Sequence, residues 1–210
     1  MEIYTDRYIF VIYFICMSKS EQTKAFIIEK TAPIFNMKGY AGTSLSDMTE
    51  ATNLTKGSIY GNFANKDEVA LAAFDYNLGR VNGILNREMA KQDSARGKLK
   101  VYGKIYTDSA DHSFPAGGCP VLNTAIESDD THPELRKKAV AAIHSWRKNL
   151  IAILEKGKEA TEFRKDINSE QTALAILALI EGGIMIARVT GKPAYRTAIL
   201  ESLNRFIEGL

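Results

Sequence analysis

The sequence predicts an all-α protein with a small N-terminal helical unit and a larger helical body. Apolar residues recur at helical spacing along most of the chain, while the alternation typical of strands is essentially absent. Clusters of proline and glycine interrupt this pattern and mark the ends of the expected helices. With 45% hydrophobic and 25% charged residues, the composition is ordinary for a soluble globular protein, and 210 residues suffice for one large or two small domains.

An apolar run opens the chain. Residues 8–17 contain no charge, but such a run is about half of the roughly 20 residues that a membrane-spanning helix needs. The acidic residues Glu2 and Asp6 precede it, whereas a signal peptide begins with basic residues. Met17 opens a sensible soluble sequence by itself. We therefore expect residues 1–16 to be a spurious upstream extension or a disordered arm, and the protein to be cytoplasmic with no membrane partner.

The first helix is expected over residues 20–38. Its apolar side chains share one face, and Gly39 follows where a C-cap glycine is common. Pro33 lies inside the pattern, where its missing N–H should bend the helix. One bent helix is our expectation, and two short helices are the alternative.

Capping residues predict the elements that follow. Ser44 is a good N-cap for a short helix that starts at Leu45, and Thr55 is one for a helix over 56–63. Asn65, with Glu68 three positions later, resembles a capping box. Further helices are expected over residues 65–92, 95–113, 119–128, 133–163, 169–189 and 193–210.

Residues 45–64 have the format of a helix-turn-helix motif, whose second helix enters the DNA major groove. Such a helix needs short side chains, a few hydrogen-bond donors and no acid that faces phosphate. The segment 56–63 meets these needs, since Gly57 and Gly61 keep its surface low. Each glycine costs about 1 kcal/mol of helix propensity, so a role other than stability is expected for them.

Local placement, and not bulk charge, supports DNA binding. The net charge is +2, and residues 18–70 contain six Lys against six Asp or Glu. Donors on the second helix would face the bases, and Lys66 and the free N–H groups of helix starts would meet phosphates. Ordinary caps and turn glycines in an unrelated helical bundle are the alternative. The candidate DNA contacts are Thr43, Ser44, Thr55, Lys56, Gly57, Ser58, Tyr60, Asn62 and Lys66.

The same segment resembles the TetR family of bacterial transcription regulators. The resemblance covers about fifty residues and rests on Phe35 to Tyr40, Thr43-Ser44, Thr55 to Tyr60, Phe63 and Lys66. Thr55 stands where serine is commoner in the family. The resemblance implies a helix-turn-helix DNA-binding domain over 17–66 and an effector-binding and dimerisation domain over 67–210. It also implies a homodimer, usually a repressor, that binds a palindromic double-stranded DNA operator and is released by a small-molecule effector.

In the helical body, residues 173–180 are apolar on every side, so that helix must be covered all round. It is either a buried core helix or part of a four-helix interface with a second chain, and the resemblance favours the interface. The candidate interface residues are Leu177, Ile180, Gly183, Ile184, Leu200 and Leu203.

A ligand pocket is expected among three neighbouring helices of the body, and its mixed character suggests a modest-sized, partly apolar effector. Each of these residues alone also has an ordinary explanation as packing or a solvated pair. The candidate ligand-binding residues are Tyr102, Tyr106, Phe114, Asn123, Glu127, His144, Trp146 and Arg147.

Enzyme chemistry finds no support in the sequence. There is no phosphate-binding loop, nucleophile signature or metal-spaced set of His, Cys and carboxylates, so we expect no catalytic residue, cofactor or metal site. The two cysteines, Cys16 and Cys119, are too far apart to suggest a disulfide framework. Cys119 is expected to be a small buried residue, with a redox sensor as the alternative. A helical adaptor that has lost DNA binding is a third possibility, which the intact Lys56 and Tyr60 argue against.

Overall fold

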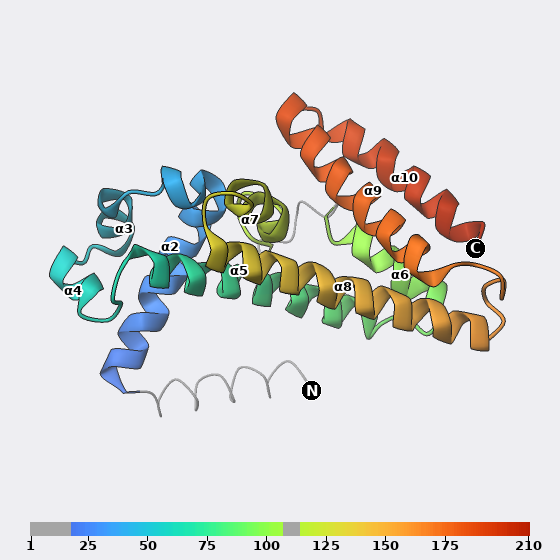
Figure 1. The fold of residues 1–210 in the computed structure, drawn as a ribbon, viewed down its shortest axis with the longest axis horizontal. Coiled ribbons are helices and arrows are strands. Elements are labelled where there is room, and N and C mark those ends of the chain that lie inside the picture. The colour runs from blue at the N-terminus through green and yellow to red at the C-terminus, as the bar shows by residue number, and fades with distance from the viewer. Residues whose placement is uncertain (1–17, 107–113) are drawn as a thin grey trace. The chain divides into compact units, whose positions relative to one another are not determined.

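The structure is a computed structural model that describes residues 18–106 and 114–210. In these ranges every regular element is a helix (Figure 1), which confirms the predicted all-α class. The expected extension over residues 1–16, and the end of the helix expected over 95–113, lie outside the described residues. The helices are α2 (Lys19–Gly42), α3 (Leu45–Thr52), α4 (Lys56–Tyr60), α5 (Lys66–Met89), α6 (Ala95–Lys104), α7 (Pro120–Ser128), α8 (Pro133–Glu159), α9 (Ser169–Thr190) and α10 (Pro193–Glu208).

The chain forms two compact units, and the boundary between them lies after Tyr76, inside α5. The sequence-based boundary after residue 66 coincides instead with the start of that helix. The difference arises because the first turns of α5 bury Val69, Ala70 and Ala73 in the core of the first unit. Helix α5 therefore contributes residues to both units.

Helix α2 departs from helical backbone angles at Gly39 (φ 73°, ψ 179°) and not at Pro33. The positive φ is one that glycine adopts without strain, so the predicted C-cap position is where the straight helix ends. Pro33 remains inside the helix with helical angles, so the departure from helical angles falls at Gly39 and the bend expected at Pro33 stays a prediction.

The predicted caps of the next two helices are confirmed. The Ser44 hydroxyl accepts a hydrogen bond from the Asp47 N–H at 3.1 Å, and the Thr55 hydroxyl accepts one from the Ser58 N–H at 3.2 Å. Helix α4 is shorter than expected and ends at Tyr60. A tight turn follows it, in which the carbonyl of Ile59 accepts the N–H groups of residues 62 and 63.

The core of the first unit joins all of its helices. Met48 of α3 and Ile59 of α4 are fully buried together with Ile27 of α2 and Val69 of α5. Burying such side chains provides about 1.5–3 kcal/mol each. This shared core fixes which side of each short helix faces outward.

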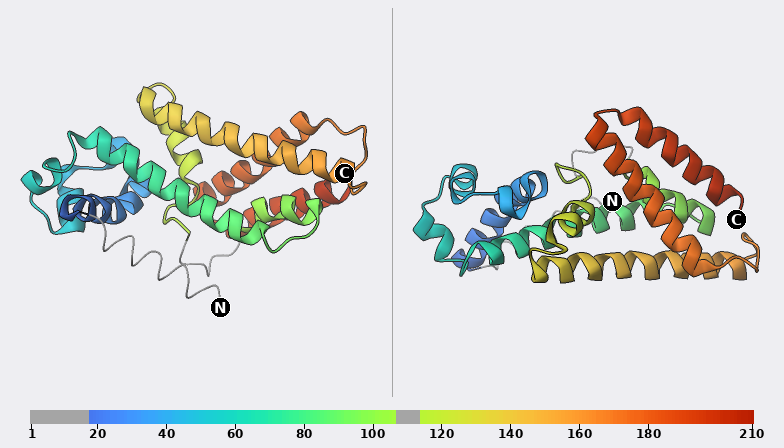
Figure 2. Two further views of the ribbon diagram at one scale, coloured as in Figure 1. Left: turned by 90° about the horizontal axis from the view of Figure 1, so that it is seen from below. Right: turned by 45° about the horizontal axis from the view of Figure 1, so that its top comes forward.

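In the second unit, α9 and α10 run antiparallel side by side, and α8 packs against α6, α7 and α9 (Figures 1 and 2). Helix α6 also packs against α10, where a side chain at Gly103 would press on Leu200 and Leu203. Among the described residues, α9 alone has the length and apolar composition of a membrane span. That is weak evidence, because core helices of soluble proteins have the same properties.

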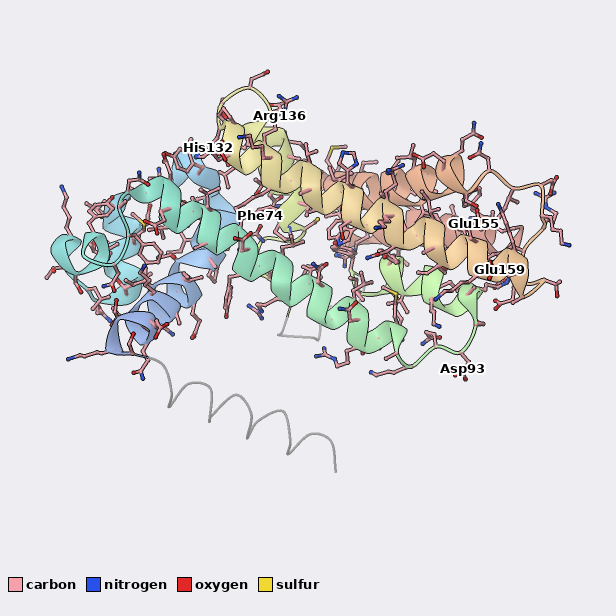
Figure 3. All side chains as sticks on the ribbon, turned by 60° about the horizontal axis from the view of Figure 1, so that its bottom comes forward. Phe74, Asp93, His132, Arg136, Glu155 and Glu159 are labelled. Atoms are coloured by element: carbon pink, nitrogen blue, oxygen red, sulfur yellow. The ribbon has the colours of Figure 1, made fainter. Side chains whose placement is uncertain are left out.

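The C-terminal end of α8 is held by a close contact. Figure 3 shows this helix running from the region of His132 and Arg136 to Glu159. Phe163, just beyond its end, is buried against Gly157, and the Arg96 guanidinium lies 5.1 Å from the centre of the Phe163 ring. A methyl group at Gly157 would overlap that ring. The Phe163 ring is therefore enclosed on both sides.

Replacing Gly157 with alanine should lower the free energy of unfolding by about 1–3 kcal/mol, because the enclosed ring cannot move aside without strain. Gly83→Ala is the matched control, since in the described part of the chain no atom beyond the neighbouring residues and backbone of its own helix lies within 4 Å of a methyl group placed there. The control should raise the stability by up to about 1 kcal/mol through helix propensity. Urea unfolding followed by the fluorescence of Trp146, the only tryptophan, measures both variants. Equal free energies of unfolding for the two variants would contradict the close contact between Gly157 and the Phe163 ring.

Candidate functional site

Helix α4 presents a low, basic surface on the side opposite its buried residue, Ile59. Thr55, Lys56 and Gly57 are exposed, while Ser58 and Tyr60 are half-buried. A methyl group at Gly57 would meet only the Thr55 hydroxyl, at 3.9 Å, and the backbone there does not require glycine. Packing inside the chain therefore does not explain this glycine, whereas close approach of an outside partner does.

Lys66 lies in the first turn of α5 and is held against an aromatic ring. Its ammonium lies 4.4 Å from the centre of the Tyr40 ring, and the Tyr40 hydroxyl donates a hydrogen bond to the Asp67 carboxylate. That bond, together with burial, raises the pKa of Tyr40 to about 12. Lys66 is thus a positive charge in a defined position at a helix start, as phosphate binding requires.

Asn62 is bonded within the chain. Its side-chain amide donates to the Ser58 carbonyl at 2.9 Å, and its oxygen accepts from the Ser20 hydroxyl at 3.1 Å. This amide joins the start of α2 to the turn after α4. A contact between Asn62 and DNA bases, as the sequence suggested, would have to compete with these bonds.

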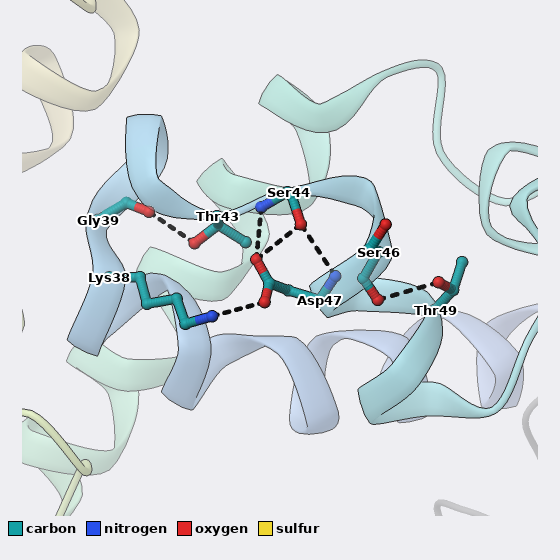
Figure 4. A network of polar contacts seen from close by, with 7 residues as sticks. All are labelled: Lys38, Gly39, Thr43, Ser44, Ser46, Asp47 and Thr49. Atoms are coloured by element: carbon teal, nitrogen blue, oxygen red, sulfur yellow. Dashed lines mark hydrogen bonds and ion pairs between the residues drawn. The ribbon is translucent and has the colours of Figure 1, made fainter.

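A carboxylate of the chain itself occupies the start of α3 (Figure 4). Asp47 accepts hydrogen bonds from the Ser44 N–H at 2.7 Å and the Ser44 hydroxyl at 2.8 Å, and its other oxygen lies 2.5 Å from the Lys38 ammonium. The Lys38 contact, followed by the Ser44 bonds, holds the pKa of Asp47 well below its usual range. A phosphate at Ser44 would therefore meet groups that are already paired with a negative charge.

Thr43 is almost fully buried, and its hydroxyl donates to the Gly39 carbonyl at 2.6 Å. It closes the turn between α2 and α3, so its hydroxyl is not presented at the surface. The predicted DNA contacts thus separate into two groups. Thr55, Lys56, Gly57, Ser58 and Tyr60 are exposed or half-buried on α4 and at its N-cap, and Lys66 is half-buried at the start of α5. The polar groups of Thr43, Ser44 and Asn62, in contrast, are used within the fold.

The second unit contains a small apolar cavity of about 10 Å³, room for the centre of one water-sized molecule. Three of the predicted ligand-binding residues, Tyr102, Tyr106 and Trp146, line it. Phe114 lies beside it, with its ring 5.1 Å from that of Tyr106 in an edge-to-face arrangement. The remaining lining residues are Val81, Leu85, Ile105, Leu177, Ile180 and Glu181.

The other predicted ligand-binding residues do not line this cavity. Arg147 forms an ion pair with Glu170, and His144 is exposed. Asn123 is bonded to the Gly117 carbonyl and to Arg188. Glu127 is half-buried on α7. Their part in ligand binding stays a prediction.

Glu181 is the cavity residue that the sequence analysis missed. It is the single charged residue between Glu170 and Arg188 on an otherwise apolar helix, and that isolation was the available signal. Its carboxyl accepts a hydrogen bond from the Cys119 thiol at 3.2 Å, and burial raises its pKa to about 7. Burial also raises the pKa of the Cys119 thiol, which keeps it protonated and poorly reactive.

The predicted interface residues are mostly buried within one chain. Ile180, Gly183, Ile184, Leu200 and Leu203 pack inside the second unit, and Leu177 is half-buried at the cavity. They therefore offer little surface to a second chain. In residues 18–106 and 114–210, no group of three His, Cys, Asp or Glu residues is placed to hold a metal ion.

Comparison with known proteins adds independent findings. Residues 27–73 match the model of bacterial regulatory proteins of the tetR family, and residues 95–203 match the tetracyclin repressor-like C-terminal domain. The crystal structure of a TetR-family transcriptional regulator from Cytophaga hutchinsonii is 54% identical, with a TM-score of 0.89 over 92% of this chain and 97% of that one.

Two curated relatives are also similar over most of the chain. An uncharacterized HTH-type transcriptional regulator from Lactococcus lactis is 32% identical over 174 residues, which are 80% of this chain and 84% of that protein. The HTH-type transcriptional repressor DhaR from Mycobacterium sp. strain GP1 is 25% identical over 167 residues, 78% and 81% of the two chains.

The lowered pKa of Asp47 predicts a pH-dependent contribution to stability. The carboxyl group of an unfolded aspartate has a pKa of about 3.9. Because folding lowers the pKa of Asp47, its stabilisation is fully present above about pH 5 and is lost as the pH falls below about 4. Urea unfolding followed by circular dichroism should show that the wild type has a higher free energy of unfolding than Asp47→Asn at neutral pH. This difference should shrink as the pH falls below about 4. Lys38→Ala should show a weaker pH dependence than the wild type. An advantage that does not change with pH would contradict this prediction.

Proposed function

Because the chain belongs to the TetR family of bacterial regulatory proteins, we propose that it is a repressor that binds a palindromic DNA operator as a dimer and leaves it when a small-molecule effector binds. The family is one of transcription regulators and not of enzymes, and its members are helix-turn-helix proteins that typically bind DNA and ligands. The relative DhaR is a transcriptional repressor, which supports repression rather than activation by this chain. A cytoplasmic location follows from a DNA partner.

The outer side of α4 carries this proposal. Its exposed Lys56, the unexplained Gly57 beside it and the cap residue Thr55 form a surface that can approach base edges. Tyr60 ends the same helix, and Lys66, held at the start of α5 against the Tyr40 ring, is available for a phosphate. We assign DNA binding to these residues rather than to Thr43, Ser44 and Asn62, whose polar groups are bonded within the chain.

A second copy of the chain would cover the exposed apolar side of α9 and α10. Leu174, Met185 and Val189 are exposed at spacings of eleven and four residues, which places them on one face of α9. Tyr195 and Phe206 are exposed on α10, eleven residues apart. An isologous pair of such faces gives the two-fold symmetry that a palindromic operator requires.

The small apolar cavity that Tyr102, Tyr106 and Trp146 line is the proposed effector site. It lies among α5, α6, α8 and α9, and its lining is apolar apart from a few polar groups, as in known ligand pockets. Val81 and Leu85 bring α5 into this lining, and α5 begins with Lys66. An effector that moves α5 would therefore act on a helix that also carries a proposed phosphate contact.

Replacing Lys56 with alanine should weaken binding to the specific DNA by about 1–3 kcal/mol and bring it closer to binding of unrelated DNA, as expected for the loss of one base contact. The probe is the DNA that flanks the protein's own gene, with a scrambled fragment of the same length for comparison, and a gel shift at several salt concentrations measures binding. Lys137→Ala, at an exposed lysine of α8, is the control and should bind as the wild type does. Unchanged binding by Lys56→Ala would show that α4 is not the recognition helix.

Replacing Met185 with glutamate should convert the dimer into monomers at micromolar concentration, because the two-fold axis would bring like charges together in an apolar interface. Val140→Glu on α8 is the matched control, since Val140 and Met185 are 42% and 43% exposed. Light scattering after size-exclusion chromatography measures both variants. If the dimer persists in Met185→Glu but is lost in Val140→Glu, the interface lies on α8 and not on α9.

A further inference from the structure

Two polar atoms at the apolar cavity have no hydrogen-bond partner among the described residues. They are Oε2 of Glu181 and the hydroxyl oxygen of Tyr102, and both are buried. Asn149 lies near enough to influence the pKa of Tyr102, but it makes no hydrogen bond of normal geometry with the hydroxyl. Buried polar groups are rarely left unpaired, and each such atom calls for an explanation. A ligand that pairs with them is one.

The carboxyl of Glu181 is half satisfied. The Cys119 thiol donates to Oε1, and the Tyr106 hydroxyl donates to the Cys119 sulfur at 3.5 Å, so one side of the carboxyl is tied to a chain of hydrogen bonds. Oε2, on the other side, is the unpartnered oxygen. The sulfur also accepts the Leu122 N–H at 3.4 Å, which fixes the thiol at the start of α7.

No positive charge compensates this carboxyl. Among the described residues, burial and the Cys119 hydrogen bond are the influences on the pKa of Glu181, and no lysine or arginine contributes. A buried carboxylate without a cation is costly, so the free protein holds Glu181 close to the point where it becomes neutral. A cationic ligand would supply the missing charge.

The surroundings suit an apolar body attached to that charge. Trp146 donates its indole N–H to the Asn82 side chain at 2.9 Å, which leaves its ring system for the cavity. Tyr102 and Tyr106 add two further rings, and aromatic rings attract organic cations. With a volume of about 10 Å³, the cavity must widen to admit anything larger than water.

We infer that this cavity takes a small organic cation, a protonated amine on an aromatic or aliphatic body, which donates an N–H to Oε2 of Glu181. The Tyr102 hydroxyl gains a polar partner when the ligand carries a second polar group. This inference rests on the proposed function, since it names the chemical class of the effector. It replaces the partly apolar effector of unspecified charge that the sequence suggested.

The test uses the full-length chain and three probes of similar shape. Benzylamine is a cation at neutral pH, benzyl alcohol is neutral, and benzoate is an anion. The fluorescence of Trp146, which lines the cavity, reports binding without any DNA. We expect benzylamine to bind at least tenfold more tightly than benzyl alcohol, and benzoate to bind least. Equal binding of all three probes, or tightest binding of benzoate, would overturn the inference.

The pH dependence provides a test that needs no variant. Among the described residues, the titratable groups around Glu181 are Tyr102 on α6, Tyr106 in the turn after α6 and Cys119 at the N-cap of α7, and burial raises the pKa of each. Glu181 alone among these four should change charge between pH 6 and pH 8. Benzylamine affinity should therefore increase about tenfold over this range, while that of benzyl alcohol stays constant. A benzylamine affinity that does not increase would contradict the role of Glu181.

Glu181→Gln keeps the shape of the side chain and removes its charge. We expect this variant to lose at least tenfold in benzylamine affinity and to lose its pH dependence, with benzyl alcohol unaffected. Glu201→Gln, at an exposed carboxylate of α10, is the control and should behave as the wild type does. Circular dichroism verifies that both variants are folded. If Glu181→Gln does not fold, the pH series on the wild type tests the role of Glu181 instead.

Release from DNA is measured separately, by adding benzylamine to the gel shift. Amine binding that requires Glu181 but leaves the DNA complex intact would support the ligand class and contradict the proposed regulation. DNA binding without any selective amine binding would support the proposed function and contradict the ligand class.

Discussion

Helix α4 has five residues, too few for a helix to persist in water, so it depends on the burial of Ile59. This one side chain reaches a core to which α2, α3 and α5 also contribute, and Phe63 adds a second anchor just beyond the helix. Once Ile59 faces inward, the helical repeat dictates that Lys56 and Gly57 face outward. The surface proposed for DNA is thus a consequence of apolar packing on the opposite side.

The polar groups around α4 serve to hold that arrangement. Asn62 ties the turn after α4 to the first turn of α2, and Asp47 ties the start of α3 to Lys38 near the end of the straight part of α2. Both contacts join segments that are separated in sequence. Several residues that look suited to a phosphate or a base are therefore parts of the scaffold, and the groups left for a partner are fewer and more sharply placed.

In the second unit, burial makes the charge of one carboxyl group, that of Glu181, unfavourable. Helix α9 is apolar along most of its length and packs against α8 and α10, and among these apolar residues Glu181 is exceptional. A carboxyl placed there without a basic neighbour remains a carboxylate only with difficulty. The exposed apolar face of α9, on the other hand, contains Met185 and Val189, which the described part of the chain leaves exposed. One helix thus contributes to the core, to the cavity and to the proposed dimer face.

The sequence by itself determined the helices, their caps and the family, because these depend on spacing between near neighbours. Ser44, Thr55 and Gly39 act where local pattern placed them, and the signature from Phe35 to Lys66 needs no tertiary knowledge. Tertiary structure decided what lies inside and outside. It buried Thr43 and Leu203, placed Lys38 on Asp47, and brought Cys119 to Glu181 across 62 positions. Contacts between distant segments depend on how whole helices pack, and a single sequence contains no local signal for them.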